Sequence, residues 1–275
     1  MSDVFLPFQF PFMQNAFWAA LILAPPTAIL SCYLVLKGWS LMGDAIAHAT
    51  LPGIVLAYIA GLPLLLGAFL AGMFSAVAIG YLRDNSRIKQ DTVMGIVFSG
   101  LFGFGMVLYT QIESDLHLDH ILFGNILVIN GADLAQLAVI AALVLASLAL
   151  TWRSLLLHAF DPASARALGL NVNLLHYGFL VLLSATIVAT LKAVGLILAI
   201  GLMISPGAIA YLLVRRFASM MLVATLITWA AMIGGVYASF WLNSAPAPTI
   251  VLLLSAMFLL AFARKTLLAR RAVSV

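Results

Sequence analysis

Charge is scarce in this sequence. Only 8% of its 275 residues are Asp, Glu, Lys or Arg, whereas 65% are hydrophobic and the mean hydropathy is +1.18. Soluble domains contain about 25% charged and about 45–50% apolar residues, so no soluble domain fits this composition. A spanning helix needs roughly 20 apolar residues. The chain is therefore predicted to be an all-α, polytopic transmembrane helical bundle of eight to nine spans, with residues 1–275 forming a single membrane domain.

Other scarcities exclude several chemistries. Cys32 is the single cysteine, so no internal disulfide can form. Glu113 is the single glutamate, and the chain has no His-Glu-x-x-His motif and no nucleophile with a base, as an intramembrane hydrolase needs. It also lacks a Gly-x-x-x-x-Gly-Lys-Ser/Thr loop, so a separate subunit must hydrolyse ATP if ATP drives this protein. A basic face with interleaved aromatic residues is missing too, which argues against nucleic acid as a partner.

The apolar runs are separated by short connections. Only Gly61-Leu62-Pro63 separates the second run from the third, which leaves eight and nine spans open because one of the two helices is either a full span or a re-entrant segment. Segment 1–14 lacks the basic region and cleavage site of a signal peptide, so the run after it is expected to be a first span. The predicted spans cover residues 15–36, 42–60, 63–82, 92–110, 132–152, 173–191, 195–213, 218–241 and 249–263.

Basic residues predict the orientation, because Lys and Arg collect in short loops on the cytoplasmic side. If the C-terminus is cytoplasmic, the connections that carry these residues all fall on the cytoplasmic side as the spans alternate in direction. Segment 111–133 carries only acidic charge and then falls outside, where Lys192 is the one remaining cation. The inner basic residues are Arg83, Arg87 and Lys89, then Arg153 and Arg166, then Arg215 and Arg216, and finally Arg264, Lys265, Arg270 and Arg271.

Asp44 and His48 are a polar pair in an apolar run. Residues four apart share a helix face, and a carboxylate with an imidazole offers oxygen and nitrogen ligands to a divalent cation. The alternative is a helix end at which Asp44 caps and His48 packs. Near the bilayer centre a charge costs at least about 2.5 kcal/mol, so an acid there needs a partner or a function. The neighbouring Gly43 and Gly53 would let other backbones approach.

Two of the five histidines lie in the predicted outer segment, within Asp115-Leu-His117-Leu-Asp119-His120. This cluster predicts either a relay for a metal ion or, with more support, a solvated or docking surface for another protein, since the fixed ligand spacing of a closed metal site is missing. His158 and His176 flank a predicted cytoplasmic connection and are given no role.

The connection 160–170 is predicted to hold a short amphipathic helix on the cytoplasmic face. Asp161 can cap this helix, Pro162 suits its first turn and Gly169 suits its end. Such an element is suited to docking a partner. A second local feature, Ser205-Pro206-Gly207, interrupts an apolar run and predicts either freed carbonyl groups along a pathway or a packing kink.

Six motifs follow one another along nearly the whole chain. They are Gly43-Asp-Ala-Ile-Ala-His48 with Leu51-Pro-Gly53, Asp91-Thr-Val-Met-Gly-Ile-Val-Phe-Ser99, Leu118-Asp-His-Ile-Leu-Phe-Gly-Asn125, Phe160-Asp-Pro162 with Ala167-Leu-Gly169, Ala193-Val-Gly195, and Thr249-Ile-Val251. In this order they resemble the motifs of the membrane permeases of ATP-binding-cassette importers for zinc, manganese and iron. The stretch Ile204-Ser-Pro-Gly-Ala-Ile-Ala210 departs from the family's usual Ile-Pro-Ala-Ala-Thr-Ala.

The resemblance implies a type II importer-like permease of the bacterial plasma membrane. It would dimerise, with an identical or paralogous subunit, around a central pathway. Two cytoplasmic ATPase subunits would drive it, and a solute-binding protein outside would deliver the ion. Asp44 and His48 match the family's polar pair in the pathway, and 161–169, with Asp161, Pro162, Arg166 and Gly169, matches its coupling helix. His117, Asp119 and His120 belong to the outer docking or relay segment.

The substrate implied by the resemblance is a divalent ion, with the manganese and chelated-iron branch most similar. One carboxylate and one imidazole per subunit give two oxygen and two nitrogen ligands in a dimer, a set that suits manganese(II), iron(II) or zinc(II). No resident cofactor is expected. Two alternatives stay open: a proton-coupled secondary metal transporter, and an importer permease for a metal chelate such as cobalamin or haem.

Overall fold

The computed structural model describes residues 3–111 and 126–273, and within these ranges the chain is helical without strands. Nine of its helices are long and apolar enough to cross a membrane. Short helices lie at Asp3–Gln9 (η1), Ile126–Val128 (η2) and Pro162–Ala167 (α7). The nine long helices are α1 (Pro11–Lys37), α2 (Met42–Ile59), α3 (Leu64–Asn85), α4 (Gln90–Thr110), α6 (Gly131–Phe160), α8 (Val172–Val194), α9 (Leu196–Leu213), α10 (Phe217–Leu242) and α11 (Pro246–Val273).

The helix count favours nine spans over eight. The turn at Gly61-Leu62-Pro63 separates two helices that are each long enough to span, and Gly61 adopts the left-handed φ of +65° that the turn needs. The sequence placed most helix ends within a few residues. The exceptions are α6 and α11, which continue to Phe160 and Val273, past the basic residues at which the predicted spans 132–152 and 249–263 stop.

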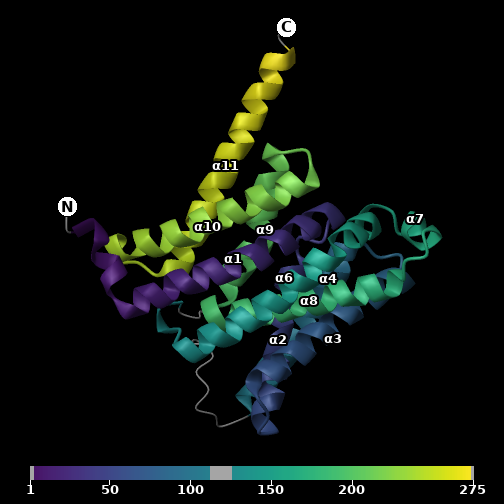
Figure 1. Cartoon of the computed structure of the whole chain (residues 1–275). Coiled ribbons are helices and arrows are strands. Elements are labelled where there is room, and N and C mark those ends of the chain that lie inside the picture. The colour runs from purple at the N-terminus through teal and green to yellow at the C-terminus, as the bar shows by residue number, and fades with distance from the viewer. Residues whose placement is uncertain (1–2, 112–125, 274–275) are drawn as a thin grey trace.

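Helix α1 lies in the middle of the bundle and packs against α6, α9 and α10. On one side α2 packs against α3, α4 and α9, and on the other α11 packs against α9 and α10 (Figure 1). The buried residues of α1 are mainly small or aliphatic, which lets its neighbours approach on several sides. The core is therefore organised around α1.

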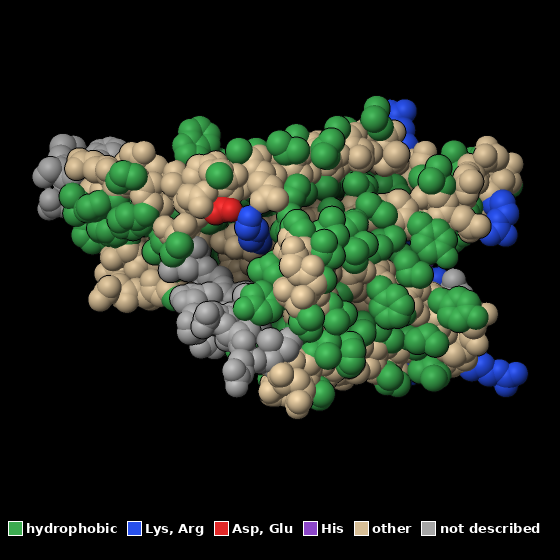
Figure 2. All heavy atoms as spheres, turned by 90° about the horizontal axis from the view of Figure 1, so that it is seen from below, with side chains coloured by type: hydrophobic (Ala, Val, Ile, Leu, Met, Phe, Trp, Pro, Cys, Tyr) green, Lys and Arg blue, Asp and Glu red, His purple; other side chains and the backbone are tan. Residues whose placement is uncertain are grey.

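One end of the bundle carries the basic residues. Figure 1 shows α7 at the end opposite the N-terminus, and we name these the α7 end and the N-terminal end. Figure 2 shows a face rich in hydrophobic side chains, with most of its Lys and Arg side chains toward one end and one basic side chain beside an acidic one away from that end. Such a charge distribution is typical of a helical membrane protein with one cytoplasmic end.

The segment Ser205-Pro206-Gly207 does not interrupt α9, which continues from Leu196 to Leu213. The Ser31 hydroxyl of α1 donates to the carbonyl oxygen of Ile204 at 3.2 Å and accepts from the backbone N–H of Gly207 at 2.9 Å. Pro206 and Gly207 are both buried. These contacts favour the packing interpretation of this segment over freed carbonyl groups along a pathway.

Candidate functional site

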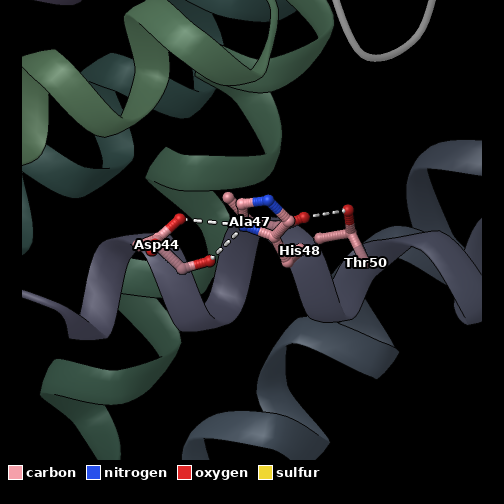
Figure 3. A network of polar contacts seen from close by, with 4 residues as sticks. All are labelled: Asp44, Ala47, His48 and Thr50. Carbon is pink, nitrogen blue, oxygen red and sulfur yellow. Dashed lines mark hydrogen bonds and ion pairs between the residues drawn. The ribbon is translucent and has the colours of Figure 1, made fainter. Parts of the chain in front are cut away.

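Asp44 and His48 lie on one face of the first two turns of α2 (Figure 3). Nδ1 of His48 is 2.9 Å from Oδ1 of Asp44 and 3.1 Å from the carbonyl oxygen of the same residue. One ring N–H cannot point well at both oxygens, and Oδ1, although buried, has no hydrogen bond of good geometry. The carboxylate therefore keeps acceptor capacity for a further ligand.

Asp44 is not a helix cap. The N-cap position of α2 is Leu41, where no side chain caps the helix, and the only contact of the Asp44 carboxylate in the described chain is His48. This geometry disfavours the capping alternative. The two side chains are 24% and 23% exposed, so the pair is reachable from outside the chain rather than sealed in its core.

The surroundings of the pair are apolar. The rings of Phe98 and Phe102 on α4 lie with their centroids 5.4 and 5.3 Å from that of His48. The hydroxyl of Thr50 does not point to the pair, because it donates to the carbonyl oxygen of Ala47 at 2.7 Å (Figure 3). Phe98 and Phe102 were not predicted from the sequence, although their spacing of four residues on a helix was a signal.

Close backbone contacts hold α2 in place. A Cβ atom added to Gly53 would overlap the carbonyl oxygen of Gly67 on α3, and one added to Gly67 would overlap that of Gly53. At Gly43 an added Cβ would lie 2.9 Å from Cβ of Met203 on α9. The predicted close approach of another backbone is confirmed at Gly53, whereas the close neighbour of Gly43 is the side chain of Met203. Both contacts hold the helix that carries the pair in place.

The described residues offer too few ligands for a closed metal site. Among the described residues no group of three or more His, Cys, Asp or Glu side chains is placed to hold a metal ion. Asp44 and His48 supply one carboxylate and one imidazole, whereas closed sites for such ions use four or more ligands. Further ligands must come from outside these residues, from water or from a second chain.

The predicted short helix at 160–170 is α7. The Asp161 carboxylate accepts from the backbone N–H groups of Ala163 and Ser164 at 3.0 Å and from the Ser164 hydroxyl. These bonds, led by the Ser164 hydroxyl, hold the pKa of the Asp161 carboxyl below its usual range. Pro162 occupies the first turn, and Gly169 follows the helix at a left-handed φ of +79°. Asp161 is thus fully used in shaping α7.

The remaining predicted positions are Arg166, His117, Asp119 and His120. Arg166 is exposed in the last turn of α7, at the basic end of the bundle. His117, Asp119 and His120 lie outside the described residues. The structure also brings together His158 and His176, whose ring centroids are 6.1 Å apart, a contact that was not predicted from the sequence.

Residues 9–265 match the model of the family described as ABC 3 transport family. The chain belongs to the ABC 3 transport family. As a member it is a multi-pass membrane transport protein, and the all-helical permease architecture predicted from the sequence is confirmed.

Named relatives agree with this assignment. The chain is 54% identical to the chelated iron transport system membrane protein YfeD of Yersinia pestis, over 93% of this chain and 86% of that protein. It is 42% identical to the manganese transport system membrane protein MntB of a Synechocystis species, over 93% and 83%. Among solved structures, PsaBC from Streptococcus pneumoniae in complex with Fab superposes with a TM-score of 0.83 at 36% identity, covering 93% of this chain and 92% of that one.

Proposed function

We propose that this ABC 3 family member is the permease subunit of an importer that moves manganese(II) or iron(II) into the cytoplasm, with zinc(II) accepted by the same ligand chemistry. The names of the relatives from Yersinia pestis and Synechocystis, which refer to chelated iron and to manganese, support this substrate class. The metal is cargo, so binding must be favourable enough for entry and weak enough for release.

The observation that carries the proposal is the Asp44–His48 pair. Its oxygen and nitrogen face the same way, and one carboxylate oxygen lacks a well-formed hydrogen bond. The Thr50 hydroxyl donates to the Ala47 carbonyl oxygen and not to the pair (Figure 3). An ionisable pair on a spanning helix is typical of an ion pathway. In this proposal Asp44 and His48 bind the ion during passage.

A second permease subunit, identical or paralogous, completes the site. Two copies of the pair give two oxygen and two nitrogen ligands. Helix α4, which packs against the site through Phe98 and Phe102, exposes Ile96, Phe104 and Val107 at 62%, 50% and 60%. In this proposal the second subunit packs on this exposed face of α4, beside the half-formed site.

In this proposal the remaining partners bind at the two ends of the helix bundle. A dimer of ATP-binding subunits docks on α7 at the basic end, which is cytoplasmic and holds the C-terminus. The N-terminal end then faces outward, where an extracytoplasmic solute-binding protein delivers the ion, and His117, Asp119 and His120 contribute to its docking surface or to a relay. The membrane is the bacterial plasma membrane, in line with the bacterial relatives.

The test is metal uptake by the complete transporter in liposomes, read by element-resolved mass spectrometry. Asp44→Asn and His48→Gln should abolish uptake while assembly with the ATPase stays normal. Thr50→Val is the matched control, because its hydroxyl is buried on the same helix and bonded to Ala47. Wild-type uptake by both site variants would remove Asp44 and His48 from the pathway.

The energy source and the form of the cargo can be decided in the same liposomes. Uptake that needs internal ATP and survives an uncoupler fits the importer, whereas collapse with the uncoupler alone would identify a secondary transporter. Competition of manganese, iron and zinc salts against a siderophore, haem or cobalamin then separates free ions from chelates.

A further inference from the structure

Two adjoining cavities lie at the α7 end, and neither Asp44 nor His48 is among the residues that line them. One, of about 410 Å³, is lined by residues at the end of α9 and by residues of α11. The other, of about 490 Å³, also includes residues from the ends of α1 and α6 and the start of α10. Tyr211, Val214, Arg215 and Lys265 line both cavities, which therefore meet. We name the pair of cavities the basic hollow.

Three cations surround the basic hollow. Arg215, Arg264 and Lys265 line it, all three side chains are exposed, and none of them pairs with an acid in the described chain. None of the residues lining the two cavities is acidic. Asp161 follows the lining residue Phe160, but its carboxylate accepts bonds from α7 itself. The hollow thus has unbalanced positive charge.

The remaining lining is apolar. Leu212, Leu213 and Leu268 line one cavity, and Phe160 and Met220 line the other. The aromatic ring of Tyr211 lies 5.8 Å from Nζ of Lys265 and is itself 53% exposed. At the end of spanning helices, cations attract the charged headgroup of a lipid, and the apolar walls beside them contact its acyl chains.

The convergence of these cations is a property of the fold. Arg215 follows α9, whereas Arg264 and Lys265 lie about fifty residues further along the chain on α11. The preference of basic residues for the cytoplasmic side accounts for Arg215 with Arg216 and for Arg264 with Lys265 as features of the sequence. Topology does not require that they line one hollow, and Arg216, which follows Arg215 directly and is also exposed, does not line it.

We infer that the basic hollow binds the headgroup of an anionic phospholipid, with Arg215, Arg264 and Lys265 contacting its phosphate and the apolar walls contacting the start of its acyl chains. Charge complementarity selects an anion, and the position among spanning helices with exposed Leu267 and Leu268 selects a lipid over a soluble ion. The cavity volumes lie within the roughly 300–1,000 Å³ common for small-molecule sites.

The inference is tested on the full-length chain co-purified with its ATPase partner. The complex is titrated in detergent with dioleoyl phosphatidylglycerol or dioleoyl phosphatidylcholine, and bound lipid is counted by native mass spectrometry. The wild type should retain the anionic lipid preferentially. Each of Arg215→Gln, Arg264→Gln and Lys265→Gln should weaken that preference about fivefold. Arg216→Gln, the matched control, should leave it unchanged.

Loss of basic residues can also disturb insertion, so a variant with unchanged charge is needed. Val214→Trp fills the region shared by both cavities, keeps every cation and should abolish the preference for phosphatidylglycerol. Equal losses in Arg216→Gln, full retention in Val214→Trp, or competition by inorganic phosphate would each overturn the inference. Loss of the ATPase partner from the Gln variants with lipid binding intact would assign the hollow to that subunit instead.

Discussion

Asp44 and Asp161 are both aspartates near the start of a helix, but the structure uses them differently. The carboxylate of Asp161 accepts two backbone N–H groups and the Ser164 hydroxyl, so its bonding capacity is satisfied by α7. The carboxylate of Asp44 caps no amide, and its contact in the described chain is the imidazole of His48. The carboxylate of Asp161 stabilises the start of α7, whereas the carboxylate of Asp44 stays available to a further ligand.

This difference matters because both residues were open to the same interpretation from sequence. An acid at a helix start stabilises that helix by capping and through the helix dipole. Only the first-turn geometry separates a structural acid from one available to a ligand. The two positions therefore predict opposite responses to the same substitution.

The largest effect is expected for Asp44→Asn, with Asp161→Asn as the comparison. Asn caps a helix about as well as Asp, so Asp161→Asn should leave metal uptake near wild type. Asp44→Asn removes the charge of a proposed metal ligand, and the loss of uptake should exceed the roughly 10–100-fold typical of losing an outer partner of a metal site. Uptake in liposomes, with protein amount and ATPase content matched, measures both. Similar losses at the two positions would end the distinction.

A large effect on stability is expected at Gly53, which holds the helix that presents Asp44. Gly53→Ala forces the added methyl group into the backbone of Gly67 and should cost more than the about 1–3 kcal/mol typical of overpacking. The readout is the melting temperature of the purified protein. Gly178→Ala on α8 is the control, since an added Cβ there meets nothing within 4 Å. Equal melting temperatures for the two variants would mean that α2 and α3 separate easily.

A smaller, selective effect is expected for Asp161→Ala. Without the cap, α7 frays, and ATP hydrolysed per ion imported should rise several-fold while ion binding is retained. Asp161→Asn, which keeps the cap, should restore the wild-type ratio. Replacement of Arg166 on the exposed part of α7 should also raise the ratio if this helix docks the ATPase. An unchanged ratio in both Asp161→Ala and the Arg166 variant would separate α7 from coupling.

The smallest effect concerns pH. Hydrogen bonds depress the pKa of the Asp161 carboxyl in the folded protein. The cap is therefore complete at any pH above the pKa of the unfolded chain, about 4, and is lost only as the pH falls through the lower pKa of the folded protein. Between about pH 5.5 and 8, wild type and Asp161→Asn should therefore have the same coupling ratio. A difference that grows toward pH 5.5 would mean that the carboxyl titrates there.

Much of the fold could be predicted because the bilayer imposes long apolar runs and short connections. The cap at Asp161 and the left-handed Gly169 were also predictable, since they depend on residues adjacent in sequence. The extensions of α6 and α11 were not, because apolar content ends at the basic residues while the backbone hydrogen bonding of the helix does not.

The candidate site was predictable only in part. The spacing of Asp44 and His48 fixes their shared helix face, and the structure agrees. The rings of Phe98 and Phe102 and the contact of Gly53 with Gly67 depend on how α2 packs against α4 and α3, which a single sequence does not encode locally. The position of the pair in the first two turns of α2, near the α7 end, likewise required the fold.

The contact between Gly53 and Gly67 has a mechanical consequence. With their backbones touching and a turn of four residues between them, α2 and α3 form a tightly joined hairpin rather than two independent helices. A displacement of the Gly61–Pro63 turn is therefore expected to move the two helices together. In the proposed transporter, an event at the tip of the hairpin would thereby move Asp44 and His48.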